Sequence, residues 1–438
     1  MQFDRVRESD GAELLIARGQ HIDCVPLLGE NRHRLVVDLE HSYTSHHGDV
    51  WCCSLPRLGT PISAELKPHA RLADGTELTE ARSVYQAIIA ADNIADSVKQ
   101  EVFDWGTTSQ DLVTSRGTLP QQASRKIFVG SIGYIREHGV YHPNALLSQS
   151  TFFVMDPLEQ VAPFAAVGDV YGLVIRDFVV ENPALIRRTA VLGLRAGGAA
   201  VASLGIDDMD MSFRHGGLRA ANPAGFQFFI RDDNFTAIRT PASDGATDIA
   251  IVGRYALAFK DDGGLVVPMA GCVMRIRRGI DSTLDAALEE IRQTGTVPWA
   301  LPQWGSVKSA FQSGPQVLVD GRLGIPDSEY PAYSLEADAT SIPFSAREAW
   351  DDQLVPKAVL GLLDTGELMH ISGERRSART LAGMLKDHGA RWGVMLDGGG
   401  STCAFLGNGV LFANREPRRN AYANWERPIP LALALASA

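Results

Sequence analysis

The sequence predicts a mixed α/β (α+β) chain with more strand than helix, on three observations. Short apolar runs of strand length recur between turn residues, as at residues 190–194 and 226–230. Helical periodicity is limited to a few segments. The 42 glycines and 22 prolines are spread along the chain, and no low-complexity linker separates the segments. We therefore expect strand-rich central sheets, a few helices and a smaller β-rich module at the N-terminus.

The expected strands are short apolar segments bounded by glycine, proline or polar residues. The last of them alternates leucine and alanine strictly, which predicts a final strand with one face against a core. The strands expected on this basis are residues 34–38, 172–175, 190–194, 226–230, 249–252 and 431–435.

Three segments have helical signals. Residues 82–103 show mixed helical periodicity. Residues 283–294 follow a capping-box pattern that begins at Ser282. Residues 380–388 end before Gly389, a residue type that favours the end of a helix. We expect helices at these three places in a chain that has more strand than helix.

The third helix lies between two strands. A strand at residues 367–371 precedes it, and an apolar strand that ends at Asp397 follows it. This order predicts a β-α-β crossover. Asp397 would then lie at the carboxyl end of its strand, where open α/β sheets bind ligands.

The first part of the chain differs in composition from the rest. It opens with a charged segment at residues 4–10, continues through a histidine-rich stretch and contains the longest expected helix. A polar segment at residues 107–124 follows and marks a boundary. We predict an N-terminal module at residues 1–120, whose role the sequence does not indicate, and a larger domain at residues 125–438.

One short sequence occurs twice. Ala-Val-Leu-Gly-Leu stands at residues 190–194 and again at 358–362, and a glycine follows each copy at the same offset. A glycine-led strand precedes each copy, at residues 172–175 and 314–321. Five identical residues also arise by chance in apolar strands. The alternative is an internal two-fold repeat of a β-rich unit.

Composition and charge exclude several classes of protein. With 41 Lys and Arg against 52 Asp and Glu, the net charge of −11 disfavours a nucleic-acid or anionic-membrane partner. No apolar run is long enough to span a membrane. The polar start lacks the apolar region of a signal peptide, which predicts a cytoplasmic protein, or an extracytoplasmic one if the sequence is a trimmed chain.

No metal or cofactor site is expected. The five cysteines are scattered, and none forms a C-x-x-C pair. The histidine-rich stretch at residues 41–49 matches no known metal-ligand spacing, so a polar loop is the favoured interpretation. Nucleotide-binding and α/β-hydrolase motifs are absent from the sequence.

The segment Asp397-Gly-Gly-Gly-Ser401-Thr402 carries the strongest chemical signal. Glycines permit close backbone approach, so exposed N–H groups of such a turn can bind an anion beside the Ser401 and Thr402 hydroxyls. A plain Asp-Gly hairpin turn is the alternative, since that dipeptide is a common turn signal. The two interpretations remain open on spacing alone.

From about residue 140 onward, an ordered set of motifs resembles the phosphodiester glycosidase family. The resemblance includes the Leu-Asp-Gly-Gly-Gly-Ser sequence, and the order of the pieces is more specific than any one of them. The segments that carry it are residues 152–153, 171–177, 189–198, 267–271, 313–322, 381–390, 396–401, 414–417 and 427–428.

The resemblance implies a hydrolase that cleaves a sugar-1-phosphodiester, or a related glycosidic bond, in a glycan or glycoconjugate. It implies a carbohydrate or sugar-phosphate substrate and no cofactor. Asp397 is expected to be the catalytic carboxylate, and Glu374, which occupies no matching family position, is the candidate for a second one. The residues expected to bind substrate are Gln149, Lys357, Arg375, Gly398, Gly399, Gly400, Ser401, Thr402, Asn414 and Arg427.

Three positions depart from the family pattern. Gln149 stands where the family has Asn, Lys357 where it has Arg, and Ser372 where it has the Asp of an Asp-Gly-Arg motif. Lysine keeps the charge but loses the bidentate fork that suits phosphate. Two alternatives therefore remain: a non-catalytic saccharide-binding or structural protein, and a glycosidase that acts on non-phosphorylated glycosides. The sequence does not indicate the oligomeric state.

Overall fold

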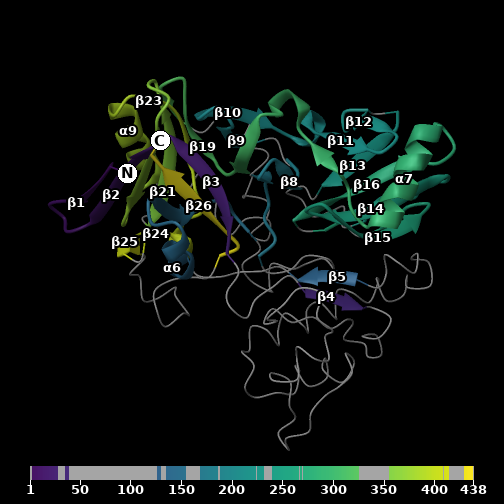
Figure 1. Ribbon diagram of the computed structural model, residues 1–438, viewed down its shortest axis with the longest axis horizontal. Coiled ribbons are helices and arrows are strands. Elements are labelled where there is room, and N and C mark those ends of the chain that lie inside the picture. The colour runs from purple at the N-terminus through teal and green to yellow at the C-terminus, as the bar shows by residue number, and fades with distance from the viewer. Residues whose placement is uncertain are drawn as a thin grey trace, which may run out of the picture.

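The computed structural model describes residues 2–27, 35–38, 126–129, 135–153, 168–185, 188–222, 224–230, 239–265, 267–268, 270–324, 355–407, 409–413 and 429–437. It is strand-rich, with several antiparallel sheets and few helices, as the sequence predicts (Figure 1). The expected helix at residues 82–103 lies outside the described residues. The other two are α7 (Ser282–Thr294) and α9 (Ala378–Asp387), beside a short α6 (Ile135–His138).

The largest sheet among the described residues has seven strands, and Asp397 follows the end of one of them, β23. The order of the sheet is β1-β2-β22-β21-β23-β19-β20. The bounds are β1 (Gln2–Arg7), β2 (Glu13–Gly19), β19 (Gln316–Val319), β20 (Arg322–Leu323), β21 (Lys357–Leu363), β22 (Leu368–Gly373) and β23 (Ala390–Met395).

Two five-stranded sheets adjoin it. One has the order β10-β9-β18-β7-β8, and the other has the order β25-β24-β6-β26-β3. The bounds are β3 (His21–Pro26), β6 (Ala145–Gln149), β7 (Val174–Arg176), β8 (Val179–Asn182), β9 (Arg188–Leu194), β10 (Gly198–Leu204), β18 (Val307–Gln312), β24 (Cys403–Leu406), β25 (Gly409–Ala413) and β26 (Leu431–Ala436).

Smaller sheets complete the described fold. Most of their strands gather with α7 in a lobe at residues 205–306, at the right of Figure 1. The bounds are β4 (Leu35–Asp38), β5 (Lys126–Val129), β11 (Asp210–Phe213), β12 (Gly216–Arg219), β13 (Phe226–Ile230), β14 (Ala246–Val252), β15 (Tyr255–Asp261), β16 (Gly271–Arg277) and β17 (Trp299–Ala300).

The sequence repeat corresponds to a repeat in topology. The first unit (β7–β10 and β18) forms a sheet of order β10-β9-β18-β7-β8, and the second unit (β19–β23) has the order β22-β21-β23-β19-β20. Each strand of one order has its counterpart at the same place in the other, and every pairing within them is antiparallel. The two copies of the repeated sequence are β9 and β21. Two-fold duplication is therefore favoured over chance identity.

The two units differ in what connects their last two strands. In the first unit, the lobe at residues 205–306 joins β10 to β18, whereas in the second, α9 joins β22 to β23. Helix α7 of the lobe begins one residue earlier than the capping pattern predicts, because Asp281 is the N-cap and accepts a hydrogen bond from the Thr283 amide.

The predicted β-α-β crossover is present. Strands β22 and β23 both pair antiparallel with β21, so they are parallel to each other with β21 between them. Helix α9 joins them, with the Ser377 hydroxyl as its N-cap. The helix packs closely because Gly361 and Gly393 lack side chains: a Cβ there would lie 2.8 Å and 3.0 Å from the methyl groups of Leu385. Asp397 thus follows the carboxyl end of β23.

Strands β1 to β3 do not form a module of their own. Strand β2 pairs with β22 of the second unit, and β3 pairs with β26 near the C-terminus. Residues 2–27 therefore contribute to the sheets of the larger domain, which their charged composition did not indicate. The boundary near residue 120 lies outside the described residues and stays a prediction.

The C-terminal strand is covered on both faces, whereas its alternation predicted one. Strand β26 lies between β6 and β3 in its sheet. Its leucines pack into the central core with residues of β2, β9 and β21, and its alanines pack against the cluster that includes Phe405 and Ile135. The large leucines of β26 therefore fill a wide core on one side, and its small alanines allow a close contact on the other.

The central core contains a histidine without a hydrogen-bond partner. His370 of β22 is fully buried between Ala17 and Leu360, and neither ring nitrogen meets a partner among the described residues. Burial lowers the pKa of His370 to about 4 because the apolar surroundings disfavour the charged ring. The ring is therefore neutral in the folded protein and gains a proton on unfolding at mildly acid pH.

We predict that His370 makes the fold sensitive to acid. Since the pKa of His370 is lower in the folded than in the unfolded chain, its stabilising contribution is complete above pH 6.5 and is lost as pH falls towards 4. The unfolding free energy falls between pH 8 and pH 5, and in a His370→Leu variant this fall should be about 2 kcal/mol smaller than in wild type. Denaturant titration at both pH values measures the difference. A variant at exposed His215 should lose as much unfolding free energy as wild type between the two pH values. If His370→Leu also loses as much as wild type, His370 is not the cause of the acid sensitivity.

Candidate active site

The predicted site lies in the loop that follows β23, here called the glycine loop (residues 397–402). Residues 399–401 form a single 3₁₀ turn, and Gly399 has a left-handed φ of 59°. A side chain at that position would be strained. Asp397 is 2% exposed, so its carboxylate lies inside the protein rather than on a solvated hairpin turn.

The loop is fixed to the start of β21. The Pro356 carbonyl accepts hydrogen bonds from the Gly399 amide at 2.8 Å and from the Thr402 hydroxyl at 3.0 Å. The Leu396 amide donates to the Ala358 carbonyl at 2.9 Å, which continues the β21–β23 register. This register places Asp397 opposite Lys357. Pro356 carries no signal in the sequence, because only the pairing of β21 with β23 brings it to the loop.

Gln149 fixes the loop from the other side. Its side chain is fully buried at the end of β6. Its Nε2 donates to the Asp397 carbonyl at 3.0 Å, and its Oε1 accepts from the Cys403 amide at 3.2 Å. The Gln149 amide therefore has a structural role, since both of its ends bind the backbone at the two ends of the loop, and its role in substrate binding stays a prediction.

The first unit also supports the loop. Ser313 follows β18 as Asp397 follows β23, and the Ser313 amide donates to the Thr189 carbonyl at 3.3 Å. The Ser313 hydroxyl donates to the Met395 carbonyl at 2.8 Å, directly before the glycine loop. The corresponding loops of the two units are thus in contact, and the first holds the second.

Two buried donors of the loop have no acceptor among the described residues. The Gly398 amide donates to Asp397 Oδ1 at 2.8 Å, and the Gly399 amide is bound to Pro356. The Gly400 amide has no hydrogen-bond acceptor in the part of the chain that the structure describes. The Ser401 hydroxyl, 1% exposed, has none there either. Of the three glycine amides expected to bind an anion, only that of Gly400 is free to do so.

Lys357 is buried beneath the loop. Its side chain is 1% exposed, and a Cβ on Gly398 would lie 3.8 Å from its Cγ. The ammonium group donates to the carbonyls of Val355 at 3.5 Å and Arg376 at 3.3 Å. Lys357 therefore supplies a positive charge close to the predicted site while it binds backbone oxygens.

Glu374 and Arg375 lie farther from Asp397. They follow β22, which is separated from β23 by β21, a distance of two strand spacings or about 10 Å. Glu374 Oε2 accepts from the Glu13 amide at 3.2 Å on the opposite side of β22. Arg375 is exposed and has a left-handed φ of 47°. The structure does not bring Glu374 together with Asp397, because its carboxylate is directed to β2.

The remaining predicted residues give no further geometry. Asn414 and Arg427 lie outside the described residues. Among the described residues, no three His, Cys, Asp or Glu side chains gather where a metal ion would bind. No helix within the described ranges is long and apolar enough to cross a membrane.

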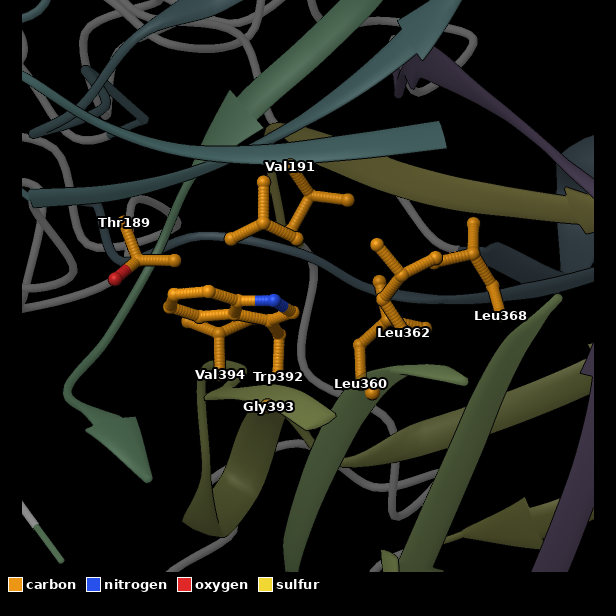
Figure 2. Close-up of a pocket in the computed structure, with 10 residues that line it drawn as sticks. Thr189, Val191, Leu360, Leu362, Leu368, Trp392, Gly393 and Val394 are labelled. Atoms are coloured by element: carbon orange, nitrogen blue, oxygen red, sulfur yellow. The ribbon is translucent and has the colours of Figure 1, made fainter. Parts of the chain in front are cut away.

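A narrow pocket between the two units is not the predicted site. Figure 2 shows the Trp392 indole facing Val191 across it, with Leu360 and Leu362 beside them. The lining comes from β9 and β10 of the first unit and from β21 to β23 of the second. None of the predicted site residues lines it, so it belongs to the apolar packing between the units.

We predict that Gln149→Leu destabilises the protein by roughly 2–4 kcal/mol, because it leaves the Asp397 carbonyl and the Cys403 amide buried without partners. Denaturant unfolding of the two proteins measures the change. Gln303→Leu is the matched control, since exposed Gln303 also donates to one backbone carbonyl, and it should cost less than about 0.5 kcal/mol. Equal losses in the two variants would show that Gln149 does not fix the loop.

Comparisons with known proteins connect this region to one family. Residues 247–436 match the family model for phosphodiester glycosidase. No curated protein matches the chain. The match supports a glycosidase-type function for the region that contains the glycine loop.

Solved structures give distant similarities. A hypothetical protein from Synechocystis is 12% identical over 99% of this chain, which spans 61% of that protein, with a TM-score of 0.41. A putative exported protein from Burkholderia pseudomallei is 14% identical over 99% of this chain and 96% of its own, with a TM-score of 0.43. The catalytic domain of zebrafish N-acetylglucosamine-1-phosphodiester alpha-N-acetylglucosaminidase, auto-inhibited by its pro-peptide, is 10% identical over 100% of this chain and 82% of its own, with a TM-score of 0.34. The resemblance to phosphodiester glycosidases that the sequence motifs predict is confirmed by the family match over residues 247–436.

Proposed function

We propose that the glycine loop is the active site of a hydrolase that cleaves the glycosidic bond of a sugar-1-phosphodiester. One observation carries the proposal: a buried carboxylate, Asp397, stands in the same loop as two buried donors without acceptors among the described residues, the Gly400 amide and the Ser401 hydroxyl. Buried donors of this kind would destabilise a plain turn, because each costs free energy unless a ligand accepts its hydrogen bond.

Asp397 would act at the anomeric carbon. Cleavage of the bond between this carbon and the phosphate oxygen passes through an oxocarbenium-like transition state, which a carboxylate stabilises as nucleophile, base or counter-charge. The bond electrons leave with the phosphate oxygen, and water supplies the hydroxyl group of the free sugar. Since a phosphate is a weak base, its departure requires less protonation than that of an alcohol.

The two free donors would bind the phosphate. Backbone amides and hydroxyls that are fixed before the substrate arrives stabilise a developing negative charge without reorganisation. The buried Lys357 ammonium adds a positive charge near the same loop. A local site of this kind works against the net charge of −11, which makes binding depend on short-range contacts.

The position of Lys357 favours a second candidate, a glycosidase that acts on non-phosphorylated glycosides. Its ammonium binds two backbone carbonyls, so less of its charge is directed to a phosphate. A panel of aryl glycosides tested beside sugar-1-phosphodiesters separates the two activities. Saccharide binding by calorimetry, without turnover of either substrate class, supports a non-catalytic protein instead.

We predict that Asp397→Asn lowers kcat for sugar release by about 10³-fold or more, since asparagine keeps the acceptor for the Gly398 amide but lacks the charge. Sugar release and thermal melting are measured together, and the melting temperature should stay close to wild type. Asp364→Asn, at an exposed turn, is the control and should keep full activity. Full activity of Asp397→Asn would exclude Asp397 from catalysis.

We also predict that Ser401→Ala raises KM for the phosphodiester by about ten-fold or more, because it removes a hydrogen bond to a charged group. Protein stability should be unchanged or increased, since the hydroxyl has no partner among the described residues. Thr402→Val should lower the stability of the protein and leave KM close to wild type, because the Thr402 hydroxyl is bound to the Pro356 carbonyl. Kinetics and unfolding midpoints of both variants are the measurement. A destabilised Ser401→Ala with normal KM would assign Ser401 a structural role.

A further inference from the structure

The charged N-terminal segment reaches the neighbourhood of the candidate site. In the hairpin formed by β1 and β2 (residues 2–19), Glu8 and Asp10 lie in the turn. Both carboxylates bind the guanidinium of Arg376, with Asp10 Oδ2 at 3.0 Å. Arg376 is 15% exposed, whereas Glu8 and Asp10 are 33% and 53% exposed, so the arginine is largely buried and its partners are partly solvated.

A second set of contacts fixes the same two segments. The Glu374 amide donates to the Glu13 carbonyl at 3.0 Å, and the Glu13 amide donates to Glu374 Oε2 at 3.2 Å. The turn that joins β22 to α9 (residues 374–377) is therefore held by the hairpin on its outer side. This turn carries Arg375, whose backbone has a left-handed φ of 47°.

The inner side of the same turn contacts Lys357. The Arg376 carbonyl accepts a hydrogen bond from the Lys357 ammonium at 3.3 Å, and Lys357 directly follows Pro356, whose carbonyl holds the glycine loop through two hydrogen bonds. A continuous series of contacts thus leads from Glu8 and Asp10 through Arg376 and Lys357 to the glycine loop. Each step in this series is an ion pair, a hydrogen bond or the peptide bond between Pro356 and Lys357.

We propose that Arg376 is a positioning residue of the glycine loop, and that its pairing with Glu8 and Asp10 sets the place of Lys357. The consequence for catalysis rests on the proposed function, whereas the structural coupling does not. Arg376 itself does not contact substrate in this proposal. It fixes one of the two backbone carbonyls that bind the buried ammonium, and so helps to hold the positive charge near the loop.

Hydrogen exchange of the full-length protein tests the coupling without an enzyme assay. Arg376→Gln removes the guanidinium group that pairs with Glu8 and Asp10. The double variant Glu8→Gln/Asp10→Asn keeps the arginine but removes the charges of its partners. Both should speed amide exchange in the glycine loop by about 5- to 30-fold, as loss of one or two such contacts does, while α7 keeps its protection. Arg376→Lys keeps the charge and should restore most of the protection.

Asp320→Asn is the matched control, since it removes an ion pair of exposed residues with Arg391 in the same sheet and should leave the glycine loop unchanged. Faster exchange confined to residues 374–377 or to the hairpin would overturn the proposal. So would a uniform increase that includes α7, which indicates a merely structural role. If Arg376→Gln fails to fold, amide exchange in the glycine loop of the Glu8→Gln/Asp10→Asn variant tests the coupling instead.

A kinetic comparison separates this proposal from the proposed function. With a sugar-1-phosphodiester, Arg376→Gln should raise KM by about 5- to 30-fold, and Arg376→Lys should reduce this effect. No turnover by the wild-type protein would contradict the proposed function, and the exchange data would still judge the coupling. Normal KM in Arg376→Gln with wild-type activity present would overturn the catalytic consequence.

Discussion

The candidate site depends on the antiparallel pairing of β21 with β23. This pairing places Pro356 and Lys357 beside the residues that follow β23, so one carbonyl can hold the glycine loop through two hydrogen bonds. A shift of one residue would turn every side chain of β23 to the other face of the sheet. The buried carboxylate, the free donors and the buried ammonium are all placed by this one register.

Duplication explains why the loop is so well supported. The two units have the same strand order, and their corresponding loops meet, with Ser313 of the first bound to Met395 of the second. The opposed pair is Thr189 and Ser313 in the first unit, and Lys357 and Asp397 in the second. Neutral residues in one copy provide support, while charged residues in the other provide the chemistry of the proposed site.

The sequence predicted the parts of this arrangement that depend on local order. The crossover through α9 and the place of Asp397 followed from adjacent segments, and five repeated residues indicated the duplication. The orientation of Gln149 and Glu374 was not predictable in the same way. Each binds a backbone group more than two hundred residues away in the chain, and only the pairing of distant strands sets such contacts.

In the proposed function, the glycine loop binds a sugar-1-phosphodiester between Asp397 and the two free donors. A crystal structure of the Asp397→Asn variant with the methyl phosphodiester of a sugar would show this binding. Phosphate oxygens should lie within about 3 Å of the Gly400 amide and the Ser401 hydroxyl, with the anomeric carbon beside residue 397. A ligand bound elsewhere, with both donors still free, would contradict it.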